Sequence, residues 1–194
     1  MKGPYTEKRN VGSRDSAARA RRRLQGTAHH EAGHAVAQSV LTHVAKLRRV
    51  TIVPDARNLG IAQSNLRPSF RPGVEADLRE IVDEIVVLLS GAAAERRFAG
   101  RANHVGAQSD YHKAVALACC VAGGEEEAQA IIRWLLARAA RFVEHRWSAI
   151  EAVAQALLER KVLSGAEVRA VIAGDQQRRH GRRRTRGTAR TRGE

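Results

Sequence analysis

Apolar positions along most of the chain recur every three to four residues, which is the spacing of an amphipathic helix. The first such stretch begins near Thr27, a favourable N-cap residue, and ends near Val44. The last one opens with Ser164-Gly-Ala-Glu167, which matches the Ser-x-x-Glu capping box. The pattern predicts the later helices over residues 74–98, with a candidate break at Ser90-Gly91, and over 110–121, 126–143, 148–160 and 165–173.

One short segment departs from helical spacing. Residues 49–53 read Arg-Val-Thr-Ile-Val, a β-branched run that stops at Pro54. Residues 55–60 have the composition of a turn, and residues 61–65 return as a second strand. The expected fold class is mainly α (α+β), with one small β-hairpin beside the helices.

The charge is concentrated at the two ends of the chain. Of the net charge of +14, residues 1–26 contribute +6 and residues 176–194 contribute +7, so residues 27–175 are close to neutral. Basic blocks without apolar periodicity are typical of disordered arms. We therefore expect a basic flexible N-terminal arm over 1–26, one folded domain over 27–175, and an Arg-rich disordered tail over 176–194. Such arms are either solvated or contact a polyanion such as nucleic acid.

Composition narrows the class of protein further. No apolar run approaches the ~18 residues that span a bilayer, and the N-terminus lacks a hydrophobic secretory core. The only cysteines, Cys119 and Cys120, are adjacent, which excludes a disulfide framework. We expect a soluble cytoplasmic protein in which both thiols are reduced and buried.

His30-Glu31-Ala32-Gly33-His34 fits the pattern His-Glu-x-x-His. On a helix, residues four positions apart lie one turn apart on the same face, so the two imidazoles can bind one Zn²⁺. Zinc lowers the pKa of a water that it binds, and the adjacent Glu31 can take the proton. The small residues Ala32 and Gly33 allow close packing of this helix, and His29 points away from the ligand face.

A catalytic zinc site needs a third protein ligand. Spacing alone offers a set of residues that it cannot rank, because each has an ordinary structural role as well. Glu95 could lie on an exposed helix face, Asp110 could cap the following helix, and the histidines could be surface residues. The candidates are Glu95, His104, Asp110 and His112.

Several segments, in order along about residues 27–173, resemble the peptidase domain of FtsH-type ATP-dependent zinc metalloproteases. Ala28–Val36 resembles that family's zinc-binding helix, and Val50–Pro54 with Leu59-Gly60 resembles its strand, turn and returning strand. Leu89–Glu95 is similar to its Gly-Gly-Arg-Ala-Ala-Glu helix, and Gly106–Asp110 to its Gly-Ala-x-Asn-Asp segment. Residues 150–158 and 163–167 resemble its C-terminal helices.

The resemblance implies a helical zinc peptidase with one Zn²⁺ per chain and Asp110 as the third ligand. It implies that Glu95 is a carboxylate supporting the site, with direct metal binding as the alternative. It also implies that an extended polypeptide substrate adds as a strand at the edge of the sheet. We place that edge at Gly60, Ile61, Ala62, Gln63 and Ser64.

The sequence departs from the family at several points. It contains no Gly-x-x-x-x-Gly-Lys-[Ser/Thr] phosphate loop, so no ATP site is expected in this chain. Ser90, Ala92 and Ser109 replace the family's Gly, Arg and Asn. Loss of the arginine is expected to weaken contacts between subunits, which leaves a homo-oligomer as an open alternative.

Three functional hypotheses follow. The first is a stand-alone zinc metalloendopeptidase that cleaves unfolded or flexible polypeptides, with Glu31 as general base. The second is a catalytically weak, peptidase-like binding or regulatory module that docks to nucleic acid or an acidic partner through its basic tails. The third is that a separate ATPase chain unfolds the substrate and this chain cleaves it.

Overall fold

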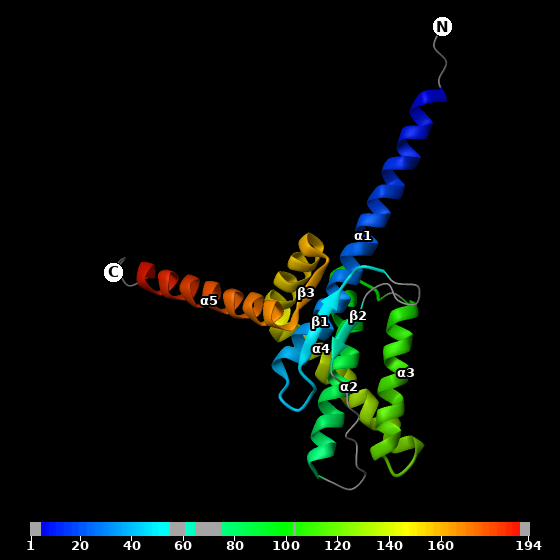
Figure 1. Cartoon of the computed structure of the whole chain (residues 1–194), viewed down its shortest axis with the longest axis vertical. Coiled ribbons are helices and arrows are strands. Elements are labelled where there is room, and N and C mark those ends of the chain that lie inside the picture. Colours follow the sequence, from blue (N-terminus) through cyan, green and yellow to red (C-terminus); the bar gives the residue numbers. More distant parts are fainter. Residues whose placement is uncertain (1–4, 55–60, 65–74, 103, 191–194) are drawn as a thin grey trace.

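The computed structural model describes residues 5–54, 61–64, 75–102 and 104–190 (Figure 1). Within these ranges, residues 5–14, 61–64, 75–77, 104–105 and 182–190 are described as backbone only. The described part is mainly helical with one small sheet, as the sequence predicts. Its elements are α1 (Tyr5–Val40), β1 (Leu47–Thr51), β2 (Ile61–Ser64), α2 (Glu75–Ala99), α3 (His104–Val121), α4 (Glu125–Arg160), β3 (Val162–Ser164) and α5 (Gly165–Arg190).

The sheet contains both predicted strands and one strand more, while the turn expected over 55–60 lies outside the described residues. Strands β1 and β2 are antiparallel, with Val50 opposite Ala62, and β3 pairs antiparallel with the other side of β1. Among the described residues, the strand order β2-β1-β3 makes β2 an edge strand. The sequence analysis missed β3, because its three residues are too few to show alternation.

Two hydrophobic clusters stabilise the fold. The first lies under the sheet and joins it to α1, α4 and α5, with Val36, Val50, Ile150 and Leu163 fully buried in it. The second lies among α2, α3 and the first half of α4. Small and aliphatic side chains dominate both clusters, in a chain of which only 4% of the residues are aromatic.

Helices α1 and α2 approach each other closely where both have small residues. A Cβ atom built on Gly33 would lie 2.5 Å from the main-chain oxygen of Ser90, which only glycine avoids. The predicted break at Ser90-Gly91 is wrong, because α2 is continuous from Glu75 to Ala99. Ser90 stays within the helix, where its hydroxyl donates to the carbonyl oxygen of Val86 at 2.6 Å.

Several helix boundaries differ from those expected. Helix α1 begins far upstream of Thr27, whose hydroxyl donates to the carbonyl oxygen of Arg23 at 3.2 Å within the helix, so Thr27 is not the N-cap. Helix α4 is one helix of 36 residues where two were expected. Helix α3 begins at His104, whereas the sequence predicted a start at residue 110.

The capping box that precedes α5 is confirmed. The backbone N–H and the hydroxyl of Ser164 both donate to Oε2 of Glu167 at 2.7 Å, and the backbone N–H of Glu167 donates back to Oγ of Ser164 at 3.3 Å. Helix α5 then continues beyond residue 173 to Arg190.

The two charged ends of the chain are helical where they are described. Figure 1 shows the first turns of α1 and the last turns of α5 projecting from the body in different directions. Residues 15–23 of α1 and 176–181 of α5 are exposed, and the partly buried part of α1 begins at Leu24. The expected flexibility of both ends stays a prediction.

Two further expectations concern the cysteines and the membrane. Cys119 and Cys120 form no disulfide, but both are exposed, so the prediction of buried thiols is wrong. They lie on the outer surface of α3, where Cys120 donates to the carbonyl oxygen of Ala116. Among the described helices, none combines the length and the apolar character needed to cross a bilayer.

Candidate metal centre

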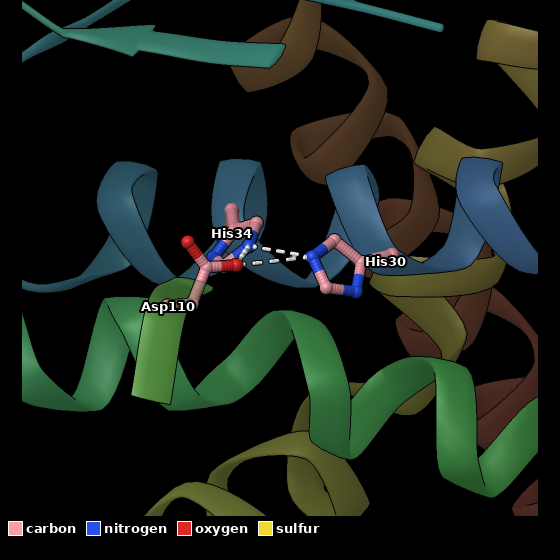
Figure 2. Close-up of side chains that lie close together, drawn as sticks. All are labelled: His30, His34 and Asp110. Carbon is pink, nitrogen blue, oxygen red and sulfur yellow. Dashed lines mark hydrogen bonds and ion pairs between the residues drawn. The ribbon is translucent and has the colours of Figure 1, made fainter. Parts of the chain in front are cut away.

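Three side chains from two helices meet at one point (Figure 2). His30 and His34 lie one turn apart on α1, and their Nε2 atoms are 3.1 Å apart. Asp110 of α3 places Oδ2 at 3.2 Å from Nε2 of His30 and at 3.1 Å from Nε2 of His34. Both histidines are buried and Asp110 is partly buried, so the group between α1 and α3 is largely shielded from solvent.

The other ring nitrogen of each histidine faces a group that accepts hydrogen bonds. Nδ1 of His34 lies 2.8 Å from the carbonyl oxygen of Val87, and Nδ1 of His30 lies 3.2 Å from Oε2 of Glu95. Because a carbonyl and an ionised carboxylate only accept, both Nδ1 atoms carry the proton in the neutral rings. Each Nε2 atom then presents a lone pair to the point where the three side chains meet.

This arrangement suits a divalent cation. Two Nε2 lone pairs and a carboxylate oxygen at 3.1–3.2 Å from one another repel unless a positive charge lies between them. Tetrahedral ligands at about 2.0–2.1 Å from Zn²⁺ are ~3.3 Å apart, close to these separations. Three protein ligands of the His₂-carboxylate type leave one position open, as catalytic zinc sites require.

The pKa values of the candidate ligands respond to the same crowding. Burial acts to lower the pKa of His30, but hydrogen bonds to Asp110 and Glu95 outweigh it and raise the pKa to about 9. Burial acts to raise the pKa of Asp110, and the bonds with His30 and His34 outweigh it and hold the pKa well below its ordinary value. The site therefore attracts positive charge, whether from protons or from a metal ion.

Glycines make room for this site on the neighbouring helices. A Cβ atom on Gly91 of α2 would lie 2.3 Å from Nε2 of His34, a distance that real contacts do not reach. On α3, a Cβ atom on Gly106 would lie 3.8 Å from Cε1 of His30, in ordinary contact. Gly91 is thus required for the position of the His34 ring.

Comparison with known proteins identifies the family. The family model described as Peptidase family M41 matches residues 17–123, more than half of the chain and all three candidate ligands. The chain belongs to peptidase family M41. The resemblance to FtsH-type proteases noted in the sequence is therefore confirmed.

The curated relatives that are similar to this M41 domain are much longer proteins. An ATP-dependent zinc metalloprotease FtsH 1 of Symbiobacterium thermophilum is 35% identical over 170 residues, which cover 75% of this chain and 28% of the relative. An ATP-dependent zinc metalloprotease FtsH of Thermus thermophilus is 35% identical over 61% of this chain and 17% of its own length. A mitochondrial inner membrane m-AAA protease component of Mus musculus is 38% identical over 86 residues, which cover 44% of this chain and 10% of the relative. The chain thus spans less than a third of the length of these relatives.

Within this M41 domain, Glu31 follows the first histidine directly and is buried. Burial raises the pKa of the Glu31 carboxyl, while the neighbouring His34 and His30 act to lower it. Glu95 is buried on α2 rather than exposed, and it contacts His30 through Nδ1. That contact places the carboxylate of Glu95 directly against the candidate ligand His30.

The structure places the other residues that the sequence suggested for the site as follows. His112 is exposed on α3, and the side chain of His104 lies outside the described residues. Asp110 lies inside α3 and does not cap it. Of the proposed substrate edge, Ile61–Ser64 form β2, and Gly60 lies outside the described residues.

Sequence reasoning missed three contributors to the site. Val87 acts through its main-chain oxygen, which has no signature in the sequence. Gly91 was noted only as a candidate helix break. Lys113 was not considered, although its Nζ lies 3.2 Å from Oδ1 of Asp110, the oxygen turned away from the histidines. Its position three residues after Asp110 on a helix could have identified this pair.

Proposed function

We propose that this chain is a zinc-dependent metalloendopeptidase that hydrolyses peptide bonds of unfolded or flexible polypeptides. The observation that supports this most directly is the convergence of His30, His34 and Asp110 beside Glu31. The M41 relationship and the names of the zinc metalloprotease relatives agree with it. In this proposal His30, His34 and Asp110 hold one Zn²⁺ per chain.

Zinc bound at such a site supplies Lewis acidity, which activates water and polarises the substrate carbonyl. The residues of the chain do the rest. Glu95 and the carbonyl of Val87 keep both Nδ1 atoms protonated, so that both Nε2 atoms remain available as ligands. Glu31 accepts the proton of the attacking water and later returns it to the leaving amine.

The substrate is expected to bind as an additional strand. Strand β2 is an edge strand and packs near α1, the helix that contains both histidines. An extended polypeptide can add to such an edge through main-chain hydrogen bonds, independently of its sequence. The edge at Ile61–Ser64, extended by Gly60, is therefore our proposed substrate-binding strand.

The test compares the unaltered chain with Glu31→Gln. We expect one zinc ion per chain in both proteins, measured by elemental analysis, and casein cleavage reduced by about 10²–10⁴-fold in the variant. Glu159→Gln, an exposed change on α4, is the matched control and should cleave normally. Stoichiometric zinc with cleavage unaffected by Glu31→Gln would contradict the mechanism.

The relatives' names describe ATP-dependent enzymes. We therefore propose that an ATPase, on a separate chain, delivers unfolded substrate to this domain. Isolation of the protein from its native cell under mild conditions, followed by mass spectrometry, would identify such a chain. The alternative, a binding module with basic tails, predicts DNA binding that depends on residues 176–194.

A further inference from the structure

His29 lies one residue before a metal ligand, but its ring faces other neighbours. The imidazole stacks on Phe98 of α2, with ring centroids 3.9 Å apart and planes inclined by 11°. Trp147 of α4 also stacks with this ring, with centroids 5.6 Å apart and planes inclined by 21°. Only 8% of His29 is exposed, so one buried ring joins α1, α2 and α4.

The partners of His29 are themselves held in place. The guanidinium of Arg97 on α2 lies 4.5 Å from the centroid of the Trp147 ring and pairs with Glu144 on α4. Nδ1 of His29 donates to the carbonyl oxygen of Gln25 at 2.8 Å, which satisfies a polar atom of the buried ring. The ring is therefore fixed by stacking with two aromatic rings and by one hydrogen bond.

The contact that orients His30 lies directly beside this stack. Glu95, which contacts Nδ1 of His30 at 3.2 Å, is three residues before Phe98 and lies on the same face of α2. A Cβ atom on Gly26 would lie 3.2 Å from Oε1 of Glu95, so the backbone of α1 rests against this carboxylate. Two consecutive residues of α1 thus contact two residues one turn apart on α2.

We propose that His29, stacked with Phe98 and Trp147, is a positioning residue that sets the orientation of His30 at the metal site. It acts by fixing the rotation of α1 against α2, because any rotation that released the His29 ring would also separate His30 from Glu95. It contacts neither the metal nor the substrate. This inference rests on the proposed zinc site.

The experiment measures metal binding in ring-deleting and ring-keeping variants. Zinc affinity is measured by competition with a chromophoric chelator, and ligand geometry by the visible absorption spectrum of the Co²⁺-loaded protein. We expect His29→Ala to weaken zinc binding by roughly 10–100-fold, as loss of support to a metal-ligating histidine does, and to alter the cobalt spectrum. His29→Phe keeps a ring for stacking and should retain most of the affinity and the original spectrum.

His180→Ala is the matched control. His180 makes the same bond from Nδ1 to the carbonyl oxygen four residues earlier, at 2.8 Å from Gln176, but it is exposed on α5. This variant should bind zinc normally. If His29→Ala does not fold, Phe98→Leu removes the facing ring while keeping apolar bulk, and the same loss of affinity is expected.

Two results would overturn the inference, and they are distinguishable. If His29→Ala keeps its helical circular dichroism and loses only thermal stability, with unchanged zinc affinity and cobalt spectrum, then the stack is merely structural. If the unaltered chain itself fails to bind zinc, the proposed function fails along with this inference.

Discussion

At the scale of single residues, Gly91 is the clearest constraint on the site. Glycine inside a helix normally costs about 0.5–1 kcal/mol relative to alanine, so Gly→Ala should stabilise α2 if nothing opposed it. Here the added Cβ atom would lie 2.3 Å from Nε2 of His34, while the opposite side of that ring is held by Val87. We expect Gly91→Ala to lower zinc affinity by at least ~10-fold and stability by ~1–3 kcal/mol.

A matched glycine separates the two effects in this prediction. Gly174 lies inside α5, and a Cβ atom there would meet only the flexible end of Arg178 at 3.5 Å. Gly174→Ala should leave zinc affinity unchanged and raise stability slightly, as measured by chelator competition and urea unfolding. Equal behaviour of the two variants would mean that Gly91 does not set the position of His34.

Some residues of the candidate metal site could be predicted from the sequence and others could not. The proposed roles of His30, Glu31 and His34 were predictable because they depend on helical spacing within one element. Asp110 could not be selected by spacing, since it meets the histidines only through the packing of α3 against the rest of the fold. Resemblance to a family supplied that choice, and the support from Val87 was invisible because it comes from the main chain.

At the scale of elements, the capping box before α5 permits a prediction with a pH dependence. Bonds from the backbone and hydroxyl of Ser164 are the main cause that lowers the pKa of Glu167 below its ordinary value of 4.5. A carboxyl whose folded-state pKa is depressed stabilises the fold above its unfolded pKa and loses that effect as the pH falls. Ser164→Ala should lower the melting temperature by ~2–4 °C at pH 7.

The pH series tests the assignment of this cap. Because Glu167 is protonated in both states once the pH lies below its folded-state pKa, the difference between Ser164→Ala and the unaltered chain should shrink below about pH 4.5. Scanning calorimetry at pH 7, 5 and 3.5 measures it. A difference that grows as the pH falls would contradict the sign of this linkage.

Errors in predicting the elements have a common physical origin. Thr27 has the residue type of an N-cap, but the helix continues through it because the preceding alanine-rich and arginine-rich residues also favour helix. Helix α4 runs through Ser148, whose hydroxyl bonds Asp175 of α5 instead of capping a new helix. Both residues have the side-chain type of an N-cap. The helix propensity of the neighbouring residues at Thr27, and a tertiary contact at Ser148, determined where the helices begin.

At the scale of the whole molecule, the ends of the chain contain nearly all of the net charge. Residues 176–194 contribute +7 of the +14, and their described part projects from the body (Figure 1). Deletion of residues 176–194 should therefore leave zinc content and casein cleavage unchanged, while any salt-sensitive binding of DNA in a gel-shift assay should disappear. Cleavage lost on deletion would show that the tail belongs to the peptidase machinery. Absence of binding by the full chain at low salt would end the nucleic-acid alternative.

The proposed substrate-binding edge of the sheet leads to a prediction about substrates. A strand-adding edge needs an extended segment, which a folded protein offers only during rare unfolding, with unfolded fractions of about 10⁻³–10⁻⁶. This chain should therefore cleave casein rapidly and a stable folded domain very slowly. Destabilising mutations in that folded substrate should raise its cleavage rate in proportion to its unfolded population.

The same series tests whether an unfolding partner is needed. Rates are compared for one substrate domain and a set of its destabilised variants, with Glu31→Gln as the control for contaminating proteases. A rate that follows the unfolded population means that the chain itself supplies only hydrolysis, so an ATPase chain added with ATP should accelerate cleavage of the stable domain most. Equal rates for stable and unstable substrates would contradict the strand-addition proposal, because the site would then have to accept structured surface loops.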